Sequence, residues 1–96
     1  MNQLIKDRWI SALESGEYQQ GYGSYHRGDP ETYCVMGVLL DVLKRESKLD
    51  EYVPQISYLM IAQHLVPCMY HVDQLIDMND RGMPFPDLAI WIKENV

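Results

Sequence analysis

The sequence predicts a mainly α-helical, compact single domain of four to five helices, packed around a central buried helix over residues 34–47. A short β-hairpin is expected near 22–33. Two observations predict this class: apolar residues recur at helical spacing in several segments, and Gly and Pro interrupt residues 17–33 repeatedly. Ninety-six residues suffice for one hydrophobic core, so 1–96 is read as a single globular domain.

The central helix is the most apolar part of the chain. Val35 and Leu39 mark one face of 34–47, and Leu40 widens it. A helix that is apolar on nearly all sides is buried on several of them. Gly37 costs this helix up to about 1 kcal/mol relative to Ala, which close approach of another backbone would offset.

The other helices follow from the same periodicity. Pro54 and Pro86 suit first turns, whereas Gly16 and Gly82 suit the position after a helix end. The expected ranges are 2–15, 54–65, 70–80 and 86–94. Asn79 continues the apolar stripe of 70–80, so we expect it to be buried and bonded to the backbone of a neighbouring loop.

A Tyr-rich hairpin precedes the central helix. A Gly-Asp-Pro turn at 28–30 is expected to join strands over 22–27 and 31–33. Tyrosines separated by Gly and Ser are typical of adaptable binding surfaces, although the same rings could instead cover the central helix. The candidate binding residues are Tyr18, Gln20, Tyr22, Tyr25, His26 and Tyr33.

Cys34 is the one candidate nucleophile that the sequence singles out. A thiol at a helix N-terminus has a lowered pKa, and His26 or Asn79 could complete a catalytic set. The alternative is that Cys34 is a small buried hydrophobic residue. Both cysteines, Cys34 and Cys68, are expected to be free thiols.

No metal or cofactor is predicted. His64, Cys68 and His71 could join Cys34 around zinc, but their spacing fits none of the standard patterns. Residues 77–88 begin like a calcium loop but end on Leu88, where a bidentate Glu belongs. We assign Asn79 and Asp80 a structural role, as a cap at the end of the helix expected over 70–80. Gly37 is assigned a structural role in the central helix.

The net charge of the protein limits the classes of binding partner. A net charge of −6 argues against direct nucleic-acid binding and permits a basic partner protein. The longest apolar run, 35–40, is too short for a membrane span, and the N-terminus lacks the apolar core of a signal peptide. We therefore expect a small acidic cytoplasmic protein without membrane contact; nothing in the sequence indicates an oligomeric state.

Three segments carry a resemblance to a known family. They are WISALESGEYQQG at 9–21, YCVMGVLLDV at 33–42 and LIDMNDRGMPFPDLAIWIKENV at 75–96. They resemble uncharacterised small phage and prophage proteins with the motifs W-x-x-A-L-x-S-G-x-Y-x-Q, C-x-G-V-L and L-N-D-x-G-x-x-F. Tyr33 stands where many members have a second Cys, and Met78 where they have Leu. The resemblance implies a viral origin and a compact helical fold, and supplies no reaction.

These observations favour a non-enzymatic phage accessory protein of the host-takeover or anti-defence type. It is expected to engage a host protein in the host cell cytoplasm by protein–protein interaction. One alternative is a Cys34-dependent enzyme acting on a small molecule or peptide, which a Cys34–His pair would favour. The other is a small-ligand-binding protein, which a closed pocket lined by Tyr22, Tyr25 and His26 would favour.

Overall fold

The computed structural model describes residues 3–23, 26–28, 31–46 and 69–96. In these ranges the chain forms four helices and one two-stranded antiparallel hairpin, so the predicted mainly helical class is confirmed. The elements are α1 (Gln3–Ser15), β1 (His26–Gly28), β2 (Glu31–Tyr33), α2 (Val35–Glu46), α4 (Met69–Asp80) and α5 (Phe85–Asn95). The helix expected over 54–65 lies outside the described residues.

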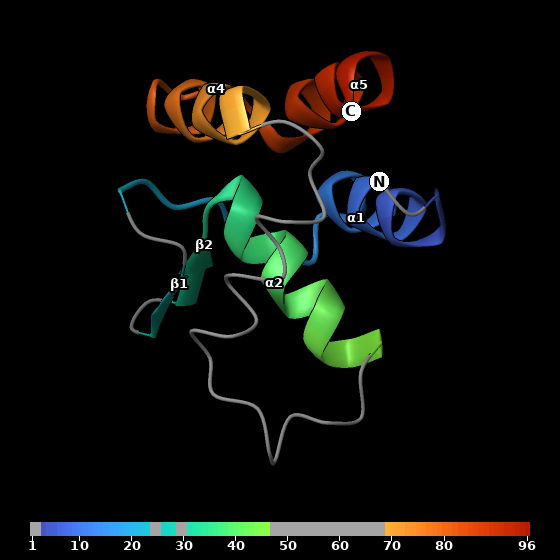
Figure 1. Cartoon of the computed structure of the whole chain (residues 1–96). Helices are drawn as coiled ribbons and strands as arrows, with labels where there is room; N and C mark the ends of the chain where they lie inside the picture. The colour runs from blue at the N-terminus through green and yellow to red at the C-terminus, as the bar shows by residue number, and fades with distance from the viewer. Residues whose placement is uncertain (1–2, 24–25, 29–30, 47–68) are drawn as a thin grey trace.

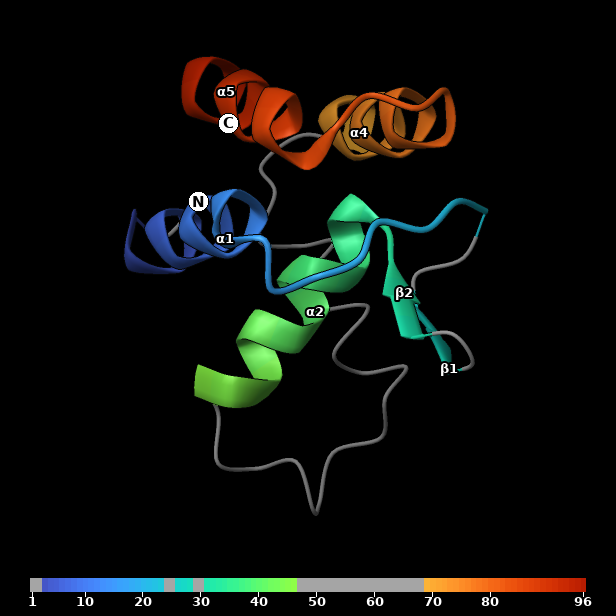
Figure 2. The same ribbon diagram turned by 180° about the vertical axis from the view of Figure 1, so that it is seen from behind.

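The helices surround the first part of α2, as predicted for the central helix. Helices α4 and α5 lie side by side across one end, α1 lies along the flank of α2, and the hairpin lies beside its N-terminus (Figure 1, and from behind in Figure 2). Helix α1 contacts both α2 and α5, and α4 contacts both α2 and α5. Within the described ranges, none of these helices has the length and apolar character needed to cross a membrane.

The core consists of the apolar stripes that the sequence predicts. Val35 and Leu39 of α2, with Leu75 of α4 and Ile92 of α5, are fully buried. Trp9 of α1 is also fully buried, and its indole Nε1–H donates to the carbonyl oxygen of Val35 at 3.0 Å. This bond gives the buried indole its partner and fixes α1 against the first turn of α2.

The hairpin is shorter at its start than predicted. Strand β1 begins at His26, and Tyr22 lies in a bend rather than in a strand. The physical reason is Gly23, whose φ of +77° belongs to the left-handed region, which an extended strand does not contain. The segment before it instead runs parallel to β2, with the Gly21 amide donating to the Tyr33 carbonyl at 2.8 Å.

Gly21 is required by this close approach. A Cβ at Gly21 would lie 2.5 Å from Oγ1 and 2.7 Å from Cβ of Thr32. The absence of a side chain therefore lets residues 19–21 pack directly against β2. This packing brings Gln20 next to the N-terminus of α2, where the polar contacts of the fold converge.

Candidate functional site

A buried polar side chain joins three parts of the fold. Asn79 on α4 is fully buried, as its place on the apolar stripe predicts. Its Oδ1 accepts from the amide of Val35 at 3.1 Å, and its Nδ2 donates to the carbonyl of Gly21 at 2.9 Å. One amide thus satisfies an otherwise unpaired donor at the start of α2 and a buried loop carbonyl.

Gln20 extends this contact to the turn between α4 and α5. Its Nε2 donates to Asn79 Oδ1 at 3.0 Å and to the Met83 carbonyl at 2.7 Å, while its Oε1 accepts from the amide of Phe85 at 3.2 Å. Asp80 accepts from the amide of Gly23 at 3.0 Å. We call Gln20, Asn79 and Asp80 the polar node; the Gln20 amide, a candidate binding group from sequence, is directed into the fold.

Cys34 lies immediately before α2 and is buried, with 4% of its surface exposed. Burial raises the pKa of the Cys34 thiol, outweighing the backbone N–H groups of Met36 and Gly37, which lower it. Among the described residues, no hydrogen bond joins this thiol to a histidine or a carboxylate. The side chain of His26, its predicted partner, lies outside the description.

Two of the predicted binding tyrosines pack on the central helix. Tyr18 is buried, its ring meets Tyr33 edge-to-face at 4.9 Å, and its hydroxyl donates to Asp41 Oδ2 at 2.5 Å. The Tyr33 hydroxyl donates to Glu31 at 2.6 Å. Burial, followed by these carboxylate contacts, raises the pKa of both phenols. Tyr22 is half exposed, and Tyr25 lies outside the described residues.

An acidic face that we did not predict runs along α4. Tyr70, Asp73, Asp77 and Asp80 are all exposed and recur at helical spacing, opposite the buried stripe that contains Asn79. We call these four residues the α4 acidic face. The spacing is present in the sequence, but it does not distinguish a binding face from a charged helix face that is simply solvated.

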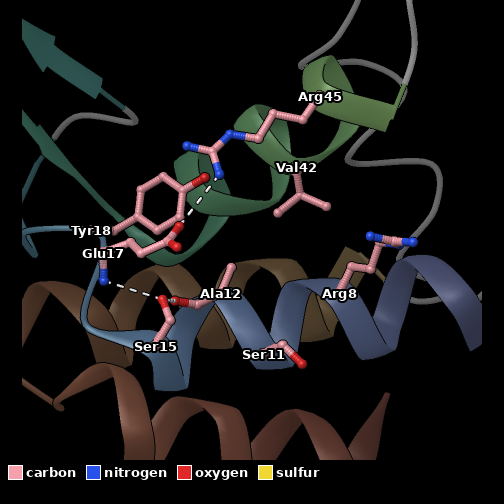
Figure 3. Close-up of a pocket in the computed structure, with 8 residues that line it drawn as sticks. All are labelled: Arg8, Ser11, Ala12, Ser15, Glu17, Tyr18, Val42 and Arg45. Atoms are coloured by element: carbon pink, nitrogen blue, oxygen red, sulfur yellow. Dashed lines mark hydrogen bonds and ion pairs between the residues drawn. The ribbon is translucent and has the colours of Figure 1, made fainter.

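A cleft between α1 and α2 was also missed. Its volume is about 310 Å³. It is lined by residues of both helices and of the segment that follows α1: Arg8, Ser11, Ala12 and Ser15 from α1, Glu17 and Tyr18 after it, and Val42 and Arg45 from α2 (Figure 3). Arg8 and Arg45 are 37 positions apart in sequence, so only the packing of the two helices reveals that they share a cleft. We call it the arginine cleft.

Metal ligation finds no support in the described residues. They contain no group of three or more His, Cys, Asp or Glu side chains placed to hold an ion. His71 packs edge-on against Trp91 with ring centroids 5.4 Å apart, and its buried Nδ1 has no hydrogen-bond partner among the residues that the structure describes. Of the three other residues considered for zinc, His64 and Cys68 lie outside the described residues, and Cys34 is buried before α2.

Comparison with known proteins identifies a family for most of the chain. The model of the domain of unknown function DUF8296 matches residues 1–68. The chain belongs to the DUF8296 family. No curated protein and no solved structure matches it.

In this DUF8296 member the polar node crosses the boundary of the matched region. Gln20, Gly21 and Val35 lie inside residues 1–68, whereas Asn79, Asp80 and Met83 follow it. The arginine cleft lies wholly inside the matched region, and the α4 acidic face lies wholly beyond it. The two surfaces are therefore distinct in sequence as well as in position.

Proposed function

We propose that this DUF8296 protein is a phage or prophage accessory protein that binds a basic host protein in the host cytoplasm and carries out no reaction itself. The resemblance to small phage proteins and the net charge of −6 both support this reading. The observation that carries the proposal is the α4 acidic face, because it combines exposed carboxylates with an exposed aromatic ring.

The composition of this face suits a partner that presents Arg or Lys. Tyr70 is 65% exposed, and Asp73 and Asp77 follow it along the same side of α4. The helical rise gives a face about 15 Å long between Tyr70 and Asp80. Helix α4 itself contains no Lys or Arg. Carboxylates attract cationic side chains, and a tyrosine ring can hold a guanidinium by a cation–π contact.

One basic residue already contacts the face. Arg81 Nε lies 3.0 Å from Asp77 Oδ2, and the two side chains are 78% and 59% exposed. An exposed pair of this kind contributes only about 0.2–1 kcal/mol. A partner guanidinium can therefore displace Arg81 at small cost.

Tyr22 widens the face at one end. The amide of Gly23 donates to Asp80, which places Tyr22 next to the C-terminal end of α4. Tyr22 is 50% exposed. Two exposed tyrosines, Tyr22 and Tyr70, thus flank the carboxylates, an arrangement consistent with aromatic enrichment at protein interfaces.

The enzymatic alternative has less support. A thiol nucleophile reacts as the thiolate, and the burial of Cys34 raises its pKa and shields it from solvent. Asn79, the other described member of the considered catalytic set, has its amide engaged in the polar node. The ligand-binding alternative requires Tyr25 and His26, whose side chains lie outside the described residues.

The proposal is tested by affinity capture from a lysate of the bacterial host, followed by mass spectrometry. The tagged protein is compared with a face variant, Asp73→Asn with Asp77→Asn. The matched control is Asp7→Asn with Glu94→Gln, which makes the same charge change at exposed positions of α1 and α5.

We expect a basic host protein to be captured by the wild type and the control, and lost with the face variant. Binding of that protein, once purified, should reproduce the same order. Equal capture by all three forms, or capture that depends on Cys34 rather than on the face, would contradict the proposal.

A further inference from the structure

We draw no further inference here: the strongest candidate, the arginine cleft between α1 and α2, carries none, because Arg45 is already held by Asp41 and Glu17, and nothing in the part of the chain that the structure describes shows what covers the rest of the cleft.

Discussion

Replacing Asn79 with Leu should destabilise the protein by about 2–4 kcal/mol. Leu branches at the same atom as Asn and is larger, so it leaves no cavity, and most of the cost comes from the lost hydrogen bonds. The substitution removes the acceptor of the Val35 amide and the donor to the Gly21 carbonyl, both at buried residues. Gln20 Nε2 loses Asn79 Oδ1 but keeps the Met83 carbonyl.

The magnitude follows from the two buried backbone groups, the Val35 amide and the Gly21 carbonyl, that lose their hydrogen-bond partner. Each buried group left without a partner costs about 1–3 kcal/mol. The sum of about 2–6 kcal/mol is an upper range, because the segment around Gly21 can shift toward solvent. Single domains of this size have a free energy of unfolding of about 5–15 kcal/mol, so the variant should still fold, with a clear loss of stability.

Equilibrium urea unfolding followed by circular dichroism measures this loss. For a slope of about 1 kcal/mol per molar, the midpoint should fall by roughly 2 M or more. Asn95→Leu is the matched control, because Asn95 is exposed and its amide, among the described residues, bonds within the last turn of α5 alone, to Trp91 O at 2.9 Å. That variant should change stability by less than about 0.5 kcal/mol. Equal midpoints for the two variants would refute the structural role assigned to Asn79.

Three further predictions follow from the packing. Gly21→Ala should cost about 1–3 kcal/mol in urea unfolding because its Cβ would lie 2.5 Å from Thr32 Oγ1, whereas the Cβ of Gly28→Ala would meet no atom of the described residues within 4 Å; similar costs for both would argue against the close approach. Native Cys34, quantified by peptide mapping, should react with iodoacetamide more slowly than a free thiol at pH 7 and faster after unfolding; rapid native alkylation would restore the enzymatic alternative. The raised pKa of Tyr18 means that the unfolded chain loses its phenol proton first, near pH 10, so stability should fall as pH rises above that value, and Tyr18→Phe should flatten the fall; an unchanged slope in urea midpoints against pH would contradict this.

The sequence predicted the local features that depend on periodicity. The stripes of α2, α4 and α5 placed the core, and the position of Asn79 on one of them indicated its burial. The helix ends were predictable where glycine takes a left-handed φ, as at Gly16 and Gly82. These features depend on residues within a few turns of one another.

Features that join distant segments were not predictable in the same way. The partner of Asn79, Gln20, is 59 positions away, and their contact requires residues 19–21 to run parallel to β2. The first strand was predicted too long because a left-handed φ at Gly23 cannot be read from a glycine alone. The arginine cleft depends on how α1 lies against α2, which no spacing along the chain encodes.

The proposed binding of a basic host protein by the α4 acidic face can be measured directly. The most direct measurement is the affinity of the purified captured protein, by calorimetry, for the wild type, the Asp73→Asn/Asp77→Asn variant and the Asp7→Asn/Glu94→Gln control at two salt concentrations. We expect at least tenfold weaker binding for the face variant, unchanged binding for the control, and weaker binding of the wild type at higher salt. Equal affinities for all three forms, insensitive to salt, would contradict it.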